Sequence, residues 1–283
     1  MYAGGSARTT RTANTLASLL IRTWNVFHGN TTPPGRTRHL ERIVRLAVAD
    51  DPAVVCLQEL PAAALGQLES WTGYVAFGVV ASRPRLPKRL AYAITDIYPG
   101  VLRSALEGQA NAILVAPGIV GRDHRSIDLN PRRFRGRLSR QLGLRFGVQV
   151  VWAKERRVAH AIRVTLPDAR TAVVANLHAT SFRADKRLAD AELLRAATFA
   201  DALAEPDEPV VLAGDFNVTV VSSPTLRALS RAEWGFSAAG PGLDHVLVRG
   251  LEVVEPEVAW PDTRRRHDGA LLSDHDPVEV RVE

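Results

Sequence analysis

Acidic, amide and imidazole side chains follow several apolar segments of this 283-residue chain, at the points where those segments end. A carboxylate at the end of a hydrophobic strand lies at a sheet edge, where a rigid scaffold can point it into a cleft. The side chains that could converge on one such edge are Glu59, Asp215, Asn217, Asp244, Asp274, His178 and His275. Carboxylate and imidazole ligands without a thiol favour Mg²⁺ or Mn²⁺ over zinc, with Ca²⁺ as an alternative structural ion. The sequence therefore predicts a divalent metal site.

These residue types together could hydrolyse a phosphate ester. Glu59 can anchor a metal that neutralises the phosphate and the leaving oxygen. A carboxylate–imidazole pair can take the proton from water, because the carboxylate fixes the tautomer of the imidazole. Neutral amides can bind phosphate oxygens as charge builds in the transition state. The amides in suitable positions are Asn25, Asn176 and Asn217.

Each candidate residue also has an ordinary structural interpretation. Glu59 could belong to the first turn of a helix, and Asp215 with Asn217 could form an Asx turn. His178 could be a buried histidine that only satisfies its own hydrogen bonds. The segment 273–275 could be a simple turn before a C-terminal strand. A functional site is favoured because these motifs occur together, not because any one of them is specific.

The segments that must position these residues alternate between strand-like and helix-like patterns. Apolar, β-branched runs predict strands at 20–27, 53–58, 74–80, 111–115, 146–152, 158–166, 171–177, 209–213, 243–248 and 277–282. Apolar residues at helical spacing predict helices at 37–50 and 183–203, with shorter ones near 61–70, 100–107 and 223–231. The Arg- and Gly-rich stretch 122–145 is expected to be a long mobile loop. This alternation indicates a mixed α/β or α+β sandwich.

The length and composition are those of a globular chain that can bury a sizeable core. Residues 1–18 are small, polar and Thr-rich, which predicts a disordered extension ahead of one catalytic domain at 19–283. No apolar stretch approaches the roughly 18 residues of a membrane span, so we expect no integral membrane segment. The single cysteine, Cys56, excludes an intramolecular disulfide and a Cys-based zinc site. We expect a cytoplasmic protein, with secretion as the open alternative.

The positive charge of the chain is concentrated in one segment. Residues 122–157 hold eleven Arg or Lys residues and three acidic ones, a local net charge of +8 in a chain of net +6. A localised basic segment suits a polyanion such as nucleic acid or an anionic membrane surface. The alternative is that the segment is a solvent-exposed basic face that binds no ligand and only reflects the arginine-rich composition of the chain.

Taken in order, the motifs resemble the endonuclease/exonuclease/phosphatase superfamily over nearly the whole chain. The resemblance is carried by Trp24-Asn25, Leu57-Gln58-Glu59, Asn176-Leu177-His178, Gly214-Asp215-Phe216-Asn217, Asp244 and Ser273-Asp274-His275. It implies a four-layered α/β sandwich with two central, mainly antiparallel sheets and a site at one rim. It also implies a metal-dependent hydrolase of phosphoric esters.

The resemblance assigns roles by position. The metal ligands it implies are Glu59, Asn25 and Asp274. The catalytic residues it implies are His178, Asp215, Asn217, Asp244 and His275. His275 is expected to be the general base, paired with Asp244, while His178 contacts the scissile phosphate. The candidates for contact with substrate phosphates are Asn176, Asn111, Arg132, Arg133 and Arg135.

The sequence lacks features typical of two subfamilies, and this narrows the range of expected substrates. Asp276 follows His275 where inositol-phosphate members prefer a basic residue, and no aromatic-rich hairpin of the sphingomyelinase kind is visible. These absences favour a nuclease, most simply a monomeric endonuclease acting on DNA. The first alternative is a phosphatase or a phospholipase- or sphingomyelinase-type enzyme of the same fold, with a small-molecule or lipid substrate. The second is an inactive domain that only binds phosphate or nucleic acid.

Overall fold

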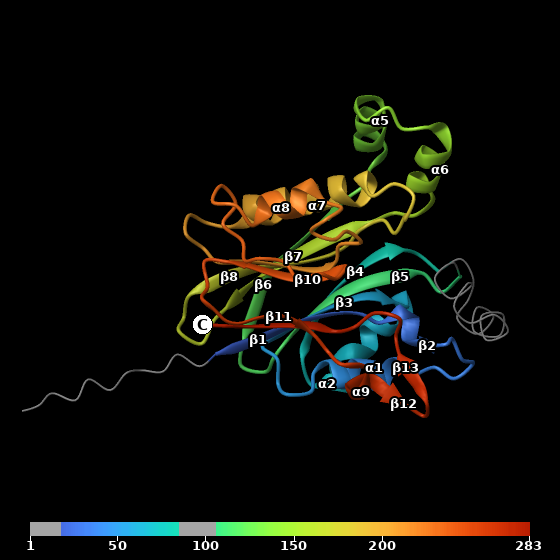
Figure 1. The fold of residues 1–283 in the computed structure, drawn as a ribbon. Coiled ribbons are helices and arrows are strands. Elements are labelled where there is room, and N and C mark those ends of the chain that lie inside the picture. The colour runs from blue at the N-terminus through green and yellow to red at the C-terminus, as the bar shows by residue number, and fades with distance from the viewer. Residues whose placement is uncertain (1–17, 85–105) are drawn as a thin grey trace, which may run out of the picture.

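Two β-sheets pack face to face, and helices cover the outer face of each (Figure 1). The computed structural model describes residues 18–84 and 106–283. The first sheet has the order β11 (Val253–Ala259), β14 (Val278–Val282), β1 (Leu19–Asn25), β3 (Val54–Leu60), β5 (Gln109–Val115) and β4 (Val75–Ser82). The second has the order β10 (Asp244–Arg249), β9 (Val210–Asp215), β8 (Thr171–His178), β7 (Val158–Thr165) and β6 (Val120–Asp128).

Both sheets are mainly antiparallel. Only β1 with β3 and β8 with β9 are parallel neighbours within these two sheets. A short third sheet joins β12 (Arg266–His267), β13 (Ala270–Leu272) and β2 (Thr31–Thr32). The predicted four-layered α/β sandwich is therefore confirmed.

The helices lie where apolar residues on the strands need cover. On the first sheet these elements are the short 3-10 helices η1 (Phe27–Gly29) and η2 (Ala62–Gln67) and the helices α1 (Leu40–Ala47) and α2 (Leu68–Thr72). The second sheet is covered by α7 (Arg187–Leu203) and α8 (Pro224–Leu229), and α9 (Asp262–Arg265) contacts β13. Among the described residues, none of the helices has the length and apolar character needed to cross a membrane.

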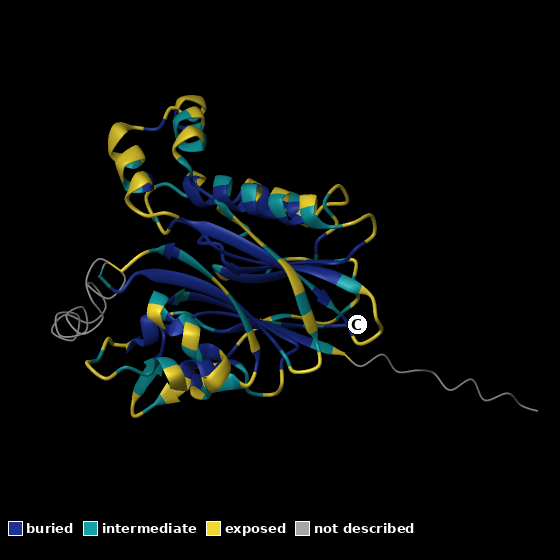
Figure 2. Ribbon diagram, turned by 180° about the vertical axis from the view of Figure 1, so that it is seen from behind, coloured by how far each residue is buried: buried dark blue, intermediate teal, exposed yellow. Residues whose placement is uncertain are grey.

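The central strands are buried on both faces. On β3, Cys56 faces the second sheet, while Val55 and Leu57 pack under α1 and α2. Figure 2 shows this continuous burial along the inner strands. Such strands are apolar at consecutive positions rather than at alternate ones, which is why they were predictable as uninterrupted runs.

Two predicted segments differ from the structure. Residues 146–152 are not a strand but part of α6 (Phe146–Lys154), and 122–145 is not a loop, because it holds the end of β6 and all of α5 (Arg132–Gln141). A short apolar run reads equally well as a strand or a helix. Here Trp152 and Val148 pack against Leu188 of α7, which selects the helix. The edge strands β6 and β11 were missed because their charged, exposed residues obscure the alternation.

Two other predictions fall mostly outside the described residues. They are the extension at 1–18, of which only Ser18 is described, and most of the short helix near 100–107. The helices predicted at 37–50 and 183–203 form, each beginning later than expected.

A bidentate ion pair closes the end of the second sheet. Arg163 Nε and Nη2 donate to Glu208 Oε1 and Oε2 at 2.7 and 3.0 Å, and Thr171 Oγ1 donates to the same carboxylate at 2.6 Å. Burial alone would raise the pKa of Glu208, but these bonds outweigh it and lower the pKa from 4.5 to about 2. The carboxylate therefore stabilises the fold wherever the unfolded chain would also be ionised, above about pH 4.5.

Glu208→Gln is expected to destabilise the protein by about 2–3 kcal/mol at pH 7. Because the folded-state pKa is depressed, this stabilisation is lost as pH falls from about 4.5 towards about 2, and the difference between wild type and variant should shrink over that range. Urea unfolding at a series of pH values measures it. The matched control is Glu255→Gln, which breaks an exposed pair with Arg281 and should cost less than about 1 kcal/mol. Equal losses for the two variants would contradict the prediction.

Candidate active site

The ends of strands from both sheets meet at one rim. On the second sheet, Asp215 pairs with Asp244 across β9 and β10, and with His178 across β8 and β9. On the first sheet, Asn25 ends β1 beside Gln58, the residue before Glu59. Asn25 Nδ2 donates to Asp215 Oδ2 at 3.0 Å, so one hydrogen bond joins the two sheets at the site. The strand register thus brings together most of the residues that the sequence singled out.

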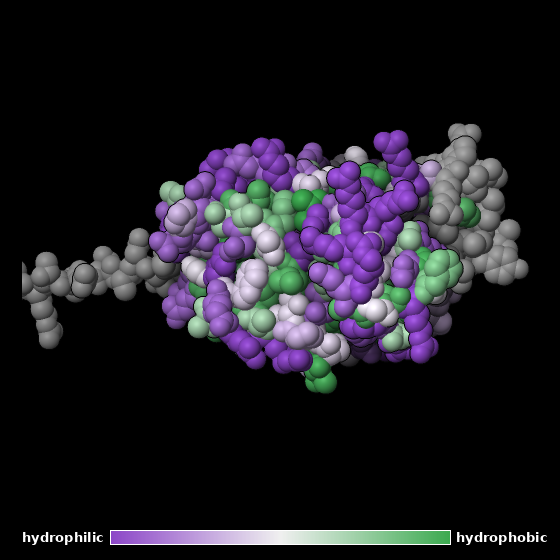
Figure 3. Space-filling model, turned by 90° about the horizontal axis from the view of Figure 1, so that it is seen from above, coloured by the Kyte–Doolittle hydropathy of each residue, from purple (hydrophilic) through white to green (hydrophobic). Residues whose placement is uncertain are grey.

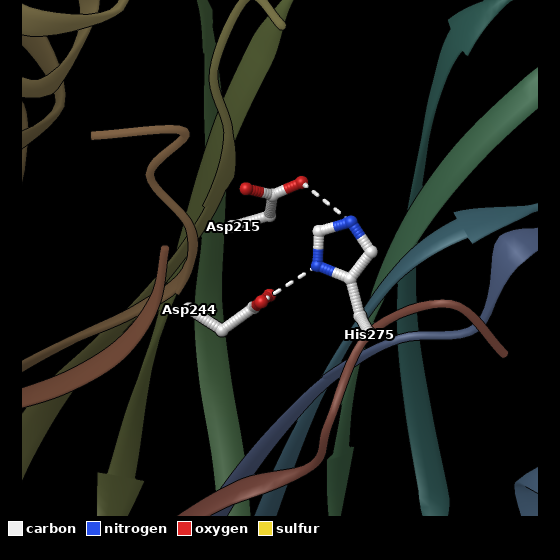
Figure 4. A group of neighbouring side chains, drawn as sticks. All are labelled: Asp215, Asp244 and His275. Carbon is white, nitrogen blue, oxygen red and sulfur yellow. Dashed lines mark hydrogen bonds and ion pairs between the residues drawn. The ribbon is translucent and has the colours of Figure 1, made fainter. Parts of the chain in front are cut away.

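His275 and Asp244 form a tight pair. His275 Nδ1 lies 2.6 Å from Asp244 Oδ2, and Nε2 on the other side of the ring lies 3.9 Å from Asp215 Oδ2 (Figure 4). Because the short bond to Asp244 places the proton on Nδ1, Nε2 is the nitrogen that faces the site. Burial lowers the pKa of His275, but Asp244 and Asp215 outweigh it and raise the pKa to about 11.

The turn that carries His275 is held from several directions. Trp24 Nε1 donates to the His275 carbonyl at 2.9 Å, and Ser273 Oγ donates to the Asn25 carbonyl at 2.6 Å. The buried guanidinium of Arg265 donates to the Ser273 carbonyl at 3.0 Å and pairs with Asp276 at 2.5 Å. The backbone on both sides of His275 is therefore held in place, and this in turn positions the imidazole. The turn is part of the site and not only a connection before the C-terminal strand.

Glu59 lies at a β-bulge. The register between β3 and β5 shifts between Leu57 and Leu60, and Glu59 adopts a φ of 55° in the left-handed region. A non-glycine residue in this region is uncommon and occurs often at functional sites. The bulge aims the carboxylate at His178 Nε2, 3.6 Å from Oε1. Burial raises the pKa of Glu59 to about 7, against the opposing effects of Arg157 and His275.

Asp215 and Asn217 follow a close approach of two strands. A Cβ on Gly214 would lie 2.0 Å from the carbonyl oxygen of Leu177, so no other residue fits between β8 and β9 here. Asp215 Oδ1 accepts from the Asn217 amide at 3.0 Å, and the Asn217 side chain donates to the Ala179 carbonyl at 3.1 Å. Burial and the neighbouring Asp244 raise the pKa of Asp215 to about 6.

Arg157 is a site residue that sequence reasoning did not single out. Its Nη1 lies 3.0 Å from Nε2 and 3.2 Å from Nδ1 of His178, and its side chain is buried. Gln109 Nε2 approaches His178 Nδ1 at 3.2 Å from the other side. Burial and the nearby Arg157 lower the pKa of His178 well below its usual value, so the imidazole is neutral. One signal in the sequence could have found it: Arg157 directly precedes the predicted strand 158–166. In an antiparallel pair, one strand starts at the edge where its neighbour ends, so a residue just before β7 lies near His178 at the end of β8.

Several predicted residues lie elsewhere. Asn176 is fully buried between the sheets, where it donates to the Leu57 and Ala112 carbonyls at 3.0 and 2.9 Å and accepts from Gln58 at 2.8 Å. It bridges the two sheets behind the rim. The arginines predicted to contact phosphates lie on α5 rather than among the rim side chains: Arg132, Arg133 and Arg135.

Asn111 and Asp274 lie nearer the rim. Asn111 is buried on β5, and neither of its side-chain polar atoms has a hydrogen-bond partner. Its position beside the bulge of β3 keeps it a candidate for contact with substrate. Asp274 is exposed beside His275.

The donor set fits a divalent cation. One potential ligand atom from each of Asp215, Asp244 and His275 lies within 4.8 Å of the other two. The short bond between Asp244 and His275 already occupies one atom of each, which leaves Asp244 Oδ1 buried without a partner. The pKa values of the half-buried Glu59 and the buried Asp215 are raised, which indicates crowded negative charge that a cation would offset. Glu59, Asp215 and Asp244 Oδ1 thus present carboxylate oxygens at the rim, and the predicted ligand Asn25 lies beside them, bonded to Asp215.

Comparison with known proteins gives one family and several structures of the same fold. Residues 23–275 match the model of the "Endonuclease/Exonuclease/phosphatase family". The UPF0294 protein of Klebsiella pneumoniae (strain 342) is 35% identical over 132 residues, which are 41% of this chain and 43% of that protein. The matched region is thus less than half of that relative's length.

Two solved structures show the same fold. A functionally unknown conserved protein from Enterococcus faecalis V583 superposes with a TM-score of 0.65 at 16% identity, over 94% of this chain and 99% of that one. The human Nocturnin catalytic domain, solved with a bound sulfate anion, gives 0.62 at 13% identity, over 94% and 93% of the two chains.

Proposed function

The chain belongs to the endonuclease/exonuclease/phosphatase family, and from that premise we propose that it is a metal-dependent phosphodiesterase that cleaves nucleic acid, most simply a DNA endonuclease. Members of the family are hydrolytic phosphoesterases that generally use divalent metals. The residues at the rim supply the parts that such a reaction needs, and the proposal assigns each of them a role. We further propose that the protein works as a monomer in the cytoplasm.

His275 is the general base in this scheme. Without a cation, Asp244 and Asp215 raise the pKa of His275 to about 11, which keeps the ring protonated. A divalent cation held by Glu59 and Asp215 would offset that carboxylate charge and lower this pKa. The neutral Nε2 can then take a proton from water as the oxygen of that water attacks phosphorus opposite the leaving oxygen. Asp244 holds the proton on Nδ1 and stabilises the imidazolium that forms. Asp215, 3.9 Å from Nε2, is placed to orient the attacking water. The P–O bond to the leaving oxygen then breaks, that oxygen takes a proton from bulk water, and the imidazolium of His275 returns its proton to solvent.

Donors around the phosphate offset the charge that builds during attack. Arg157 brings a buried guanidinium, whose Nη2 donates to Glu155 Oε2 at 2.6 Å and whose Nη1 faces His178. Its positive charge offsets the negative charge of a phosphate oxygen at the rim. His178, neutral in this environment, donates one hydrogen bond from its ring. Asn25, Asn111 and Asn217 are the amide candidates for the remaining oxygens. A divalent cation held by Glu59 and Asp215 would neutralise the phosphate and the leaving oxygen.

The main observation in favour of a nucleic acid substrate is a basic pair of helices that begins next to the site. Residues 132–154 comprise α5, α6 and their connection, and we call them the helical arm. They hold six arginines, one lysine and no acidic residue. Arg157, which contacts His178, lies three residues after the arm ends. A polyanion whose scissile phosphate lies at the rim would therefore meet the arm as well.

Nicking of supercoiled plasmid tests the proposal. With Mg²⁺ or Mn²⁺ we expect conversion of supercoiled to relaxed circles, and with excess EDTA we expect none. Gel electrophoresis of a time course measures it, with Arg157→Ala expected to slow cleavage by about 100-fold because a charged donor at the phosphate is lost. Robust turnover of a phospholipid or an inositol phosphate without nicking would overturn the proposal.

A lipid phosphoester is the second candidate, and one observation favours it. Phe146 and Val150 of α6 are 81% and 52% exposed, and exposed apolar side chains beside arginines also suit a membrane surface. The same substrate panel decides between the candidates. If no phosphoester is turned over with any of these metals, the chain is better described as an inactive binder.

A further inference from the structure

The helical arm stands clear of the sandwich. Figure 1 shows α5 and α6 rising from one end of the second sheet, and Figure 2 shows that most of their surface is exposed. Its base is fixed to α7, because Trp152 Nε1 donates to the buried carboxylate of Glu192 at 2.6 Å. Arg187 of α7 also donates to the Leu142 carbonyl at 2.9 Å. The arm is thus a firmly anchored projection and not a free loop.

One face of α5 presents a row of arginines. Arg133, Arg137 and Arg140 recur at spacings of four and three residues, which places them on one side of the helix, and all three are exposed. The face seen in Figure 3 has a dense group of hydrophilic side chains over this part of the molecule. Since the arm has no acidic residue, nothing within it neutralises these charges.

The outer face of α6 carries an exposed aromatic ring. Phe146 lies in the first turn with Val150 one turn later, while Val148 and Trp152 on the inner face pack against the rest of the arm and α7. Leaving a phenyl ring in water forgoes about 1.5–3 kcal/mol that its burial would provide. The exposed ring of Phe146 is therefore suited to contact with another molecule.

The two features together favour single-stranded nucleic acid over a bilayer. An interfacial helix needs a broad apolar face, whereas α6 has nine residues and exposes one large ring with one valine. Single strands are bound by cationic grooves that follow the phosphates and by aromatic rings on which bases stack. Seven positive charges in the arm that also carries this exposed ring match the second description.

We propose that the helical arm binds a single-stranded segment flanking the scissile phosphate. Arg133, Arg137 and Arg140 bind successive phosphates, and Phe146 stacks on an unpaired base. The preferred substrate is then a nucleic acid with a single-stranded region beside the cleavage point. This inference rests on the proposed function, since the arm leads from the same rim.

Binding without metal separates the arm from catalysis. In EDTA, fluorescence anisotropy of a labelled 20-nucleotide oligo(dT) should show tighter binding than a 20-base-pair duplex. Phe146→Ala should weaken oligo(dT) binding by about 10-fold and leave duplex binding within about twofold, because only the unpaired base stacks. Phe146→Trp should preserve binding, whereas Phe146→Leu, which keeps apolar area but no ring, should be as weak as alanine. The remote control Val258→Ala, exposed on β11, should change nothing.

The arginines are tested by salt dependence. Arg133→Gln with Arg140→Gln should lower the slope of log affinity against log salt by about 1.4, since each phosphate contact on a single strand contributes about 0.7. The charge-matched control pairs Arg42→Gln with Arg231→Gln, both exposed outside the arm, and should leave the slope unchanged.

Three outcomes would overturn the inference. They are equal effects of Phe146→Ala on single and double strands, equal slopes for the two arginine pairs, and binding of vesicles containing an anionic phospholipid in preference to either oligonucleotide. Failure of the proposed function is distinguishable, because plasmid nicking can be absent while metal-free oligo(dT) binding and its dependence on Phe146 persist.

Discussion

His275→Ala is expected to lower kcat/KM for phosphodiester cleavage by about 1,000-fold, in the middle of the range for loss of a general base. Among residues 18–84 and 106–283 no second base lies at this position, because the carboxylate beside His275 Nε2 is Asp215, which is already bonded to Asn25 and to the Asn217 amide. Initial rates on supercoiled plasmid at several substrate concentrations measure the loss.

The pairing with Asp244 makes a sharper form of this prediction. Asp244 acts on the reaction through the 2.6 Å bond to His275, so once the imidazole is gone its carboxylate has little left to contribute. Asp244→Asn alone should cost about 100-fold or more, yet the double variant should be no slower than His275→Ala. Independent losses that multiply in the double variant would show that Asp244 acts elsewhere, for example on the metal.

A matched histidine controls for general effects. His267 is half-buried outside the rim and contacts Asp268 and the ring of His39. His267→Ala should leave kcat/KM within about twofold of wild type. Thermal unfolding of each variant confirms that the fold persists.

Glu59→Gln is expected to have the second large effect, through the metal. The amide keeps the size of the side chain and the bulge that aims it, but it removes a negative charge from the oxygen cluster. Loss of partners outside the direct ligands already costs about 10–100-fold in metal affinity, so losing a carboxylate ligand should cost at least as much. Both the Mg²⁺ concentration for half-maximal cleavage and the Kd for Mn²⁺ measured by calorimetry should rise accordingly.

Calorimetry keeps this prediction independent of turnover. Glu255→Gln on β11 is the control, since Glu255 is an exposed acid paired with Arg281 at the end of the β1–β14 ladder opposite Asn25, and its loss should not alter metal affinity. An unchanged Kd for Mn²⁺ in Glu59→Gln would remove Glu59 from the metal site and leave Asp215 and Asp244 as its centre.

The residues that could be predicted are those at the ends of buried strands. His178 and Asp215 end runs of Val, Ala and Leu, so the sequence marks both the strand and its end, and the β8–β9 register then places them side by side. The resemblance to a known family added their roles and the sandwich. Glu59 was predictable as a residue but its bulge was not, because a backbone irregularity leaves no periodic pattern.

What could not be predicted depends on contacts between distant segments. Asn176 has the same sequence signature as His178, yet its side chain points between the sheets, where carbonyls of Leu57 and Ala112 accept its hydrogen bonds. Arg157 enters the site only because β7 starts at the rim where β8 ends. The run at 146–152 is helical because α7 offers a surface for Trp152, which no local pattern reveals.

The helical arm is inserted between two paired positions of the neighbouring strands β6 and β7. Asp128 of β6 pairs with Val158 of β7, and the Leu129 amide donates to the Arg157 carbonyl at 2.8 Å, so the chain leaves and re-enters the sheet at neighbouring points. An insertion with this geometry can be lengthened, shortened or exchanged while the ladder beneath it stays closed. The sandwich and the arm can therefore change independently in evolution. The sandwich would keep the rim residues, while changes in the arm would alter which substrates are bound beside them. Grafting the arm onto another sandwich would need partners like those on α7: Glu192 and Leu188 for Trp152, and Arg187 for the Leu142 carbonyl.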